Sequence, residues 1–265
     1  MKNNTLNILG AKRMVETAEL MTVATPDVTY RFNKNGSESV SHQPISHYSL
    51  FDRVATQLNN NGVEIIEEAH ALARDDQRYF GLMKVRPQDW DDATQDLVVG
   101  VRNAHDKSIP ATIAYGSQVM VCSNLQISSE VVLARRHTAN IERDLDQIIA
   151  RTLGSLADHR KATEKRTICY KDYDLGSTKE VDHIIMNAYR AGAIPKTKIV
   201  DVLEQWENPN HPEFKDRNAW SLHNAFTEVL KCSLMELPKR SQALNFVFDS
   251  FTGVNQVQDV ELVEI

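Results

Sequence analysis

The chain has 265 residues, of which 42% are hydrophobic and 25% are charged, a composition typical of a globular protein with one large domain or two small ones. It contains only 10 Gly and 8 Pro, which excludes a collagen-like or wholly disordered chain. The 30 Lys and Arg residues against 36 Asp and Glu give a net charge of −6, so any surface for nucleic acid must be a local basic patch.

The first half of the sequence predicts a short strand, a helix and then a sheet. Residues 28–32 alternate like a strand before the turn signal Asn35-Gly36, and apolar residues recur at helical spacing over 50–58. From residue 63 the apolar period changes to two. The later segments are too close together for helical crossovers, which favours a mostly antiparallel sheet. The predicted strands lie at 63–66, 79–85, 97–102, 112–122 and 128–135.

The second half predicts helices. Apolar residues recur every three or four positions over 141–156, which indicates a long amphipathic helix. Ser177 and Glu180 have the spacing of a capping box, and Gly192 is suited to end the helix that they begin. We therefore predict an α+β fold, with a mostly antiparallel sheet in the first half and a helical second half.

Changes in pattern along the chain predict four regions. They are an N-terminal extension (1–45), a sheet-containing α+β core (46–137), a helical region packed on the core (138–253) and an acidic tail (254–265). The tail alternates apolar and acidic residues, which suits either an ordinary terminal segment or a strand that docks on a protein partner.

Cysteine usage and hydropathy bear on the compartment. The three cysteines are odd in number and far apart, which is unlike the disulfide framework of a small secreted protein. No long apolar run resembles a signal peptide or a membrane span. We expect a cytoplasmic location in the host cell and no membrane. The absence of paired-cysteine zinc motifs and of the common phosphate-binding loops also predicts no metal and no cofactor.

Several short polar motifs occur in a fixed order along the chain. They are Asn103-x-His105-Asp106 between two predicted strands, Cys122-x-Asn124 at a strand end, His137, and Trp220-x-x-x-Asn224 in a predicted helix. This order, over roughly residues 45–235, resembles the phage/plasmid-like family of domain of unknown function 932. The resemblance implies a mobile-element origin and supplies no established reaction. One departure is that Leu125 stands where the family has a glycine.

The motif around Asn103 has two interpretations. His105, Asp106 and His137 are residue types that serve general acid–base catalysis or bind metals, although no second metal-binding motif accompanies them. In the alternative, Asp106 and Ser108 bond the backbone of a tight loop, and His105 fixes that loop to residues 135–137. Cys122 lies in an apolar strand, which favours packing over a reactive thiolate.

Positive charge is concentrated in residues 135–171, which contain nine Lys or Arg and five Asp or Glu. Basic side chains interleaved with aromatic rings suit single-stranded nucleic acid, because cations follow the backbone while rings stack on bases. The alternative is a solvated helix face with i,i+4 ion pairs. The candidate nucleic-acid contacts are Arg102, Lys107, Arg135, Arg136, Arg160, Lys161, Lys165, Arg166 and Tyr170.

Three functions remain open at this point. We favour a phage- or plasmid-encoded protein that binds or anneals single-stranded DNA in recombination without catalysis, as a homo-oligomer whose acidic C-terminal tail is available to a protein partner. The second is an anti-defence or host-interaction protein that binds a host protein or a nucleotide signal. The third is a nucleic-acid-processing enzyme that uses His105, Asp106 and His137.

Overall fold

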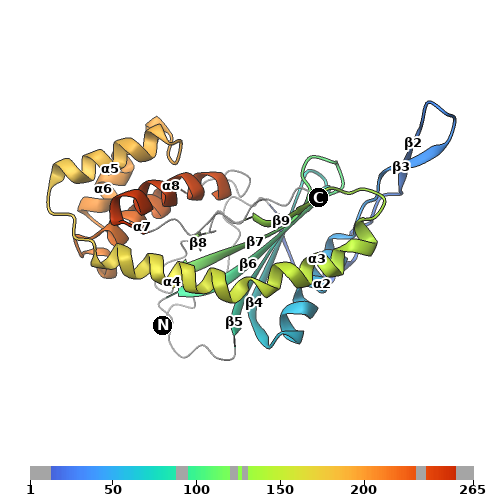
Figure 1. The fold of residues 1–265 in the computed structure, drawn as a ribbon, viewed down its shortest axis with the longest axis horizontal. Helices are drawn as coiled ribbons and strands as arrows, with labels where there is room; N and C mark the ends of the chain where they lie inside the picture. Colours follow the sequence, from blue (N-terminus) through green and yellow to red (C-terminus); the bar gives the residue numbers. More distant parts are fainter. Residues whose placement is uncertain (1–12, 88–94, 120–124, 127–130, 231–236, 255–265) are drawn as a thin grey trace.

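The computed structural model describes residues 13–87, 95–119, 125–126, 131–230 and 237–254 (Figure 1). The strands are β1 (Arg13–Val15), β2 (Thr29–Phe32), β3 (Glu38–His42), β4 (Val63–Ala73), β5 (Arg78–Pro87), β6 (Gln95–Ala104), β7 (Ala111–Val119), β8 (Leu125–Gln126) and β9 (Val131–Arg135). The α-helices are α1 (Thr17–Met21), α2 (His47–Asn60), α3 (Ile141–Gly154), α4 (Leu156–Asp172), α5 (Thr178–Arg190), α6 (Ile199–Glu207), α7 (Ala219–Val229) and α8 (Leu237–Thr252), and two short 3-10 helices are η1 (Lys196–Lys198) and η2 (Pro212–Phe214). The predicted α+β class, with its sheet in the first half and helices in the second, is confirmed.

One antiparallel sheet organises the first half. Its strand order is β1-β4-β5-β6-β7-β8, and β9 also pairs with β7. Every one of these pairs is antiparallel. The sheet therefore brings the ends of β6 and β9 to the same end of the molecule, where Arg102 of β6 neighbours Thr112 and Ala134 of β9 also neighbours Thr112.

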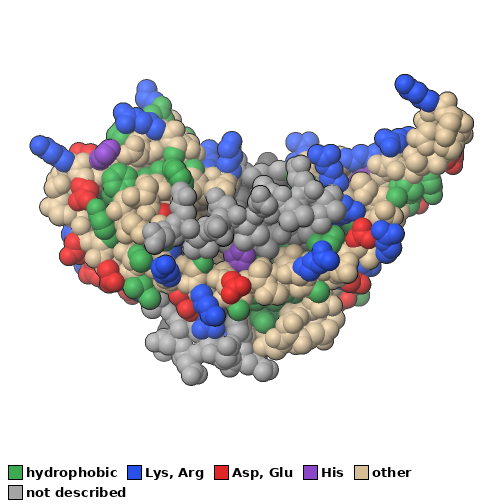
Figure 2. Space-filling model, viewed as in Figure 1, with side chains coloured by type: hydrophobic (Ala, Val, Ile, Leu, Met, Phe, Trp, Pro, Cys, Tyr) green, Lys and Arg blue, Asp and Glu red, His purple; other side chains and the backbone are tan. Residues whose placement is uncertain are grey.

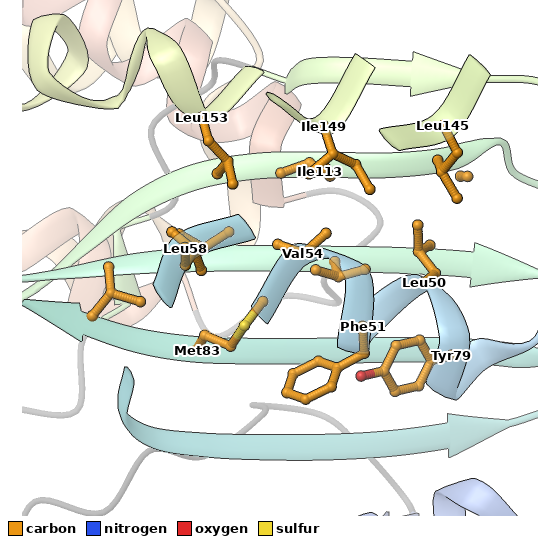
Figure 3. Close-up of a cluster of buried hydrophobic side chains, with 14 of the residues drawn as sticks. Leu50, Phe51, Val54, Leu58, Tyr79, Met83, Ile113, Leu145, Ile149 and Leu153 are labelled. Carbon is orange, nitrogen blue, oxygen red and sulfur yellow. The ribbon is translucent and has the colours of Figure 1, made fainter. Parts of the chain in front are cut away.

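Helices α2 and α3 cover one face of this sheet (Figure 3). Ser46 caps α2 by accepting a hydrogen bond from the Ser49 backbone N–H, and the helix ends before Gly62, whose positive φ of 70° a side chain would strain. The buried positions of both helices repeat every three or four residues, as the sequence predicts. Among the side chains in this first core are Leu50, Phe51, Val54 and Leu58 of α2, Leu145, Ile149 and Leu153 of α3, and Tyr79, Met83 and Ile113 of the sheet.

A second core lies among the helices of the second half. Helix α4 connects the two cores, because Leu156 at its start belongs to the first and Tyr170 near its end belongs to the second. The predicted capping of α5 is confirmed, since the Ser177 side chain accepts from the Glu180 N–H. The Glu180 carboxylate itself accepts from the Tyr173 hydroxyl at 2.7 Å, which ties α5 to the end of α4. Among the described residues, no helix has both the length and the apolar composition needed to cross a membrane.

The predicted four-region division stays a prediction, but the packing adds one fact to it. Val15, Leu20 and Ile45 come from the segment predicted as an N-terminal extension, and all three are buried in the first core. That segment therefore contributes to the hydrophobic core of the sheet layer.

Strands β2 and β3 form a separate two-stranded sheet that stands out from the body (Figures 1 and 2). We call residues 29–42 the arm. The predicted turn at Asn35-Gly36 joins its strands, with Gly36 at a φ of 80° and the Asn35 side chain accepting from the Ser37 N–H. The arm thus begins and ends in the body and exposes its strands on both sides.

Replacing Trp220 by Ala tests the second core. The Trp220 side chain is buried among the helices, so its removal leaves a large cavity, and we expect the free energy of unfolding to fall by about 3–5 kcal/mol. Chemical denaturation measures this loss. A value near zero would show that the indole does not pack as described.

Candidate functional site

A cluster of buried histidines surrounds Asn103 at the end of β6. The Asn103 amide nitrogen donates to the Ile45 carbonyl oxygen at 2.7 Å and to His47 Nδ1 at 2.9 Å. Its amide oxygen accepts from His137 Nε2 at 2.7 Å. The side chain of Asn103 is fully buried, and its hydrogen bonds join the start of α2 to the segment between β9 and α3. We call Asn103, His42, His47, His105 and His137 the histidine cluster.

The hydrogen-bond partners fix which ring nitrogens carry protons. His105 Nε2 donates to the Ile45 carbonyl at 2.9 Å, and His47 Nε2 donates to the Asp76 carbonyl at 2.9 Å, because carbonyl oxygens only accept. His47 Nδ1 accepts from Asn103, so the His47 ring is neutral. The His47 and His105 rings stack with their centroids 3.9 Å apart. Two charged rings could not stack in this way without strong repulsion.

Burial keeps this cluster uncharged. Burial first, and then the neighbouring His105, lower the pKa of His47 to about 3. Burial and then His42 lower the pKa of His137 to about 4. The pKa of His105 is also lowered, mainly by burial. For His42, burial is the largest cause and the positive charge of Lys107 is the next, and both lower its pKa.

Tyr79 extends the cluster into the first core. Its ring stacks on His47 at a centroid distance of 5.4 Å, and its hydroxyl is hydrogen-bonded to His70 Nδ1 at 2.9 Å. The hydroxyl lies over Gly81, and a Cβ at that position would collide with it. Glycine is therefore required there by the close approach of the tyrosine side chain.

The loop after Asn103 is held by Asp106. Its carboxylate accepts from Arg78 Nε at 2.8 Å and from the Ser108 backbone N–H at 3.0 Å. Desolvation acts to raise the pKa of Asp106, but the Ser108 hydrogen bonds and the Arg78 guanidinium outweigh it and hold the pKa below its ordinary value. The prediction that Asp106 bonds a backbone amide of the loop is thus confirmed, whereas the Ser108 hydroxyl donates to the Asp106 carboxylate and not to the backbone. The predicted link from His105 to residues 135–137 needs correction, because His105 bonds Ile45 and Asn103 makes that link.

The contacts of the three candidate catalytic residues indicate what each side chain does in the structure. His105 and His137 are buried and hydrogen-bonded within the protein, and Asp106 is paired with Arg78. His105 thus bonds the backbone before α2, His137 bonds the Asn103 side chain, and Asp106 bonds the backbone of its own loop. Among the described residues, no group of three or more His, Cys, Asp or Glu side chains could hold a metal ion.

Two of the predicted basic contacts, Lys107 and Arg136, lie near the base of the arm. Lys107 Nζ donates to Thr29 Oγ1 of the arm at 3.3 Å. Arg136 precedes His137, whose carbonyl accepts from the Gln43 N–H at 3.0 Å. Both side chains are exposed, and neither forms an ion pair in the described part of the chain. Together with Arg31 and Lys34 of the arm they form what we call the basic surface, and Figure 2 shows Lys and Arg side chains along the edge that leads to the arm.

Neighbouring carboxylates do not neutralise Lys107 and Arg136, because they are already paired. Asp106 bonds Arg78, and Asp144 bonds Arg135 at 3.1 Å. The latter pair also places Arg135 inside the protein, with only 13% of its side chain exposed. Arg135 is therefore no surface contact in this structure.

The basic segment of α4 divides into paired and exposed side chains. Arg160 pairs with Glu164 at 3.0 Å, which is the i,i+4 pairing that the sequence allowed as an alternative. Arg166 bonds Asp249 of α8 at 2.9 and 3.0 Å and joins the two helices. Exposed side chains without an ion pair among the described residues remain at Lys161 and Lys165.

Tyr170 is placed in the second core. It is 1% exposed, and its hydroxyl donates to Asp249 at 2.7 Å. Its ring faces are therefore covered by protein, and we remove Tyr170 and Arg166 from the nucleic-acid surface that the sequence indicated.

Arg102 lies on the sheet face opposite to that covered by α2 and α3, beside Phe80 and Thr112 in register. Burial lowers the pKa of its guanidinium. Within the described part of the chain no carboxylate bonds it. Arg102 is half-buried, and it lies in register with Thr112 and Ala134, two residues before Arg136. Its role as a nucleic-acid contact stays a prediction.

The remaining motif residues are structural where they are described. Trp220 is buried, and the Asn224 amide donates to the Trp220 carbonyl at 2.8 Å within α7. Burial is the main cause that lowers the pKa of the neighbouring His223 to about 4. Cys122 and Asn124 lie outside the described residues.

Comparison with known proteins identifies the family. The sequence model of a family described as Domain of unknown function (DUF932) matches residues 35–243. The chain belongs to this family. No curated protein and no solved structure matches the chain.

The sequence analysis did not single out the arm as a candidate site. Tyr30 and Phe32 alternate with Arg31 in the short strand predicted at 28–32, and Lys34 follows in the turn. A strand with exposed aromatic and basic residues next to a strong turn signal would have singled it out, but its separation from the main sheet becomes visible only in the structure.

Replacing Asn103 by Ala tests the histidine cluster. The substitution leaves His47 Nδ1 and the His137 N–H without their partner, so we expect the free energy of unfolding to fall by about 2–4 kcal/mol. Asn187→Ala, on the exposed side of α5, is the control and should change stability by less than about 0.5 kcal/mol. Equal stability of the two variants would contradict the role given to Asn103.

Stability should also fall on acidification. The folded-state pKa values of His47 and His137 lie below their ordinary value, so the unfolded chain binds more protons as the pH falls below about 6.5. The stabilisation is complete above that pH and is lost toward pH 4. By pH 5 we expect roughly 2 kcal/mol of loss from each of these two histidines. Chemical denaturation at pH 7.5 and 5.0 measures it, in a range above most carboxylate titrations. Equal free energies at the two pH values would contradict a neutral cluster.

Proposed function

We propose that this protein binds single-stranded DNA, as a binding or annealing protein of phage or plasmid recombination, and that no catalytic step is involved. The observation that carries the proposal is the basic surface at the base of the arm. There Lys107 and Arg136 are exposed while the adjacent carboxylates of Asp106 and Asp144 are paired elsewhere.

A protein with a net negative charge can bind nucleic acid where its positive side chains are concentrated locally. The net charge of −6 repels phosphate at long range, but in physiological salt charges more than about 8 Å away are largely screened. Binding then depends on the cations near the strand. Displacement of counterions by these side chains makes such binding strongly dependent on salt.

The position of the basic surface favours a single strand as the ligand. It continues onto the arm, which carries exposed aromatic side chains, and stacking on exposed rings is open to unpaired bases. Lys161 and Lys165 on α4 provide a second exposed pair of cations, and they lie on the helix that joins the two cores. A strand that followed both would cross the molecule lengthwise.

The test is fluorescence anisotropy of a labelled oligothymidine at several salt concentrations, with wild-type protein and a Lys107→Asn, Arg136→Gln double variant. Asparagine tolerates the positive φ of 62° at position 107, so the loop keeps its backbone. Loss of two phosphate contacts should weaken binding and reduce the slope of log K against log salt by about 1.4.

A double variant of two exposed lysines in the helical region, Lys179→Gln with Lys215→Gln, is the matched control because it removes the same charge. It should bind as the wild type does. Lys161→Gln with Lys165→Gln shows whether the strand reaches α4. If wild-type protein does not bind at low salt, the proposal is overturned, and a host protein or nucleotide signal becomes the better explanation of the basic surface.

A further inference from the structure

We infer that the arm is a base-stacking platform, on which Tyr30 and Phe32 each stack on an unpaired base. This inference rests on the proposed function and adds to it the residues that distinguish a single strand from a duplex. Tyr30 and Phe32 are not among the nucleic-acid contacts predicted from the sequence.

The exposure of these two rings has no explanation in the fold. The Tyr30 side chain is 59% exposed and that of Phe32 is 77% exposed. Neither ring contacts another aromatic ring in the described residues, and neither belongs to one of the two hydrophobic cores. Two large apolar side chains side by side on a surface mark an interaction site more often than a chance exposure.

Their geometry suits consecutive bases. Residues 30 and 32 are two apart in a β-strand, so they lie on the same face of the arm, about 6.8 Å apart along the strand. That separation leaves each ring able to take one base of an extended strand. Two-ring platforms on β-strands are a recurrent way of binding unpaired bases.

The arm is firmly held where it joins the body. His42 ends β3 and is buried, with its ring centroid 5.2 Å from that of His137. At the end of the partner strand, Thr29 accepts from Lys107. The arm is therefore already ordered in the folded protein before a strand binds, so less conformational entropy is lost on binding.

Charge complementarity favours nucleic acid over an apolar protein surface. Arg31 lies between the two rings in sequence and is held toward the opposite face by Ser39 at 3.2 Å, while Lys34 lies in the turn. Glu38 on the arm and Asp27 just before it offset these two charges. The excess positive charge that attracts phosphate comes from Lys107 and Arg136 at the base of the arm.

The experiment pairs a protein variant with an altered strand. Binding of wild-type protein and of a Tyr30→Ala, Phe32→Ala double variant is measured with oligothymidine and with an abasic strand of the same length, which keeps the phosphates and lacks the bases. We expect each lost ring to weaken binding of oligothymidine about tenfold. The two proteins should bind the abasic strand equally, because no base is present to stack.

Two controls accompany this measurement. Tyr30→Phe with Phe32→Tyr keeps both rings and should restore binding. Phe246→Ala removes an aromatic side chain of similar exposure, 58%, from α8 and should leave binding unchanged. The salt dependence of the alanine double variant should match that of the wild type, since its cations are intact.

The outcomes separate this inference from the proposed function. No binding of oligothymidine by wild-type protein overturns both. Salt-dependent binding that the alanine double variant retains in full overturns the inference alone. So does a wild-type oligomer without DNA that dissociates in the double variant, because the rings would then be a contact between copies of the chain.

Discussion

The hydrogen bonds of Asn103 connect parts of the chain that are distant in sequence. A single buried amide donates to Ile45 and His47 at the start of α2 and accepts from His137 after β9. The end of β6, the segment after β9 and the start of α2 meet at this point, and so does the base of the arm through His42. In a low-dielectric interior, an amide with its partners in place is stable, whereas any missing partner carries the full cost of desolvation. The arrangement is therefore rigid and depends on each member.

This dependence explains why the histidines stay neutral. A proton on His105 or His47 would create a positive charge in the stack of two rings whose centroids are 3.9 Å apart. The Asp106 carboxylate acts to raise the pKa of His105, but burial outweighs it and the pKa is lowered. That carboxylate itself bonds Arg78. The polar motif thus has residue types common in catalytic sites, and in the structure its side chains bond the loop, the Ile45 carbonyl and one another.

Local features of this molecule could be predicted from its sequence. The helix of residues 47–60, the turn at Asn35-Gly36 and the cap at Ser177 follow from apolar spacing, glycine and hydrogen-bonding side chains over a few residues. Strand β4 was predicted only to residue 66, because a bulge between Ile65 and Glu67 shifts the alternation and hides its continuation to Ala73.

Long-range partners could not be predicted in the same way. The bond from His105 to Ile45 spans 60 residues, and nothing in either segment indicates the other. The same holds for Arg166 and Tyr170, which in sequence belong to a basic and aromatic run suited to DNA. Their contacts depend on Asp249 of α8, which is 83 residues after Arg166 and 79 after Tyr170. The residue types of a segment indicate which contacts its side chains can make. Whether those side chains are exposed to solvent depends on the distant residues that pack against them.

Lys107 connects the loop that Asp106 holds with the basic surface. Its φ of 62° is a left-handed conformation that costs a residue with a Cβ about 1–2 kcal/mol, and glycine would adopt it without that cost. The turn is held in this form by Asp106, through Ser108 and Arg78 on either side. As a result the lysine side chain leaves the loop toward Thr29 and the base of the arm. The Asp106 contacts thus hold a strained backbone, and that backbone directs a positive charge to where the arm meets the body, which is the position from which it would act on a phosphate.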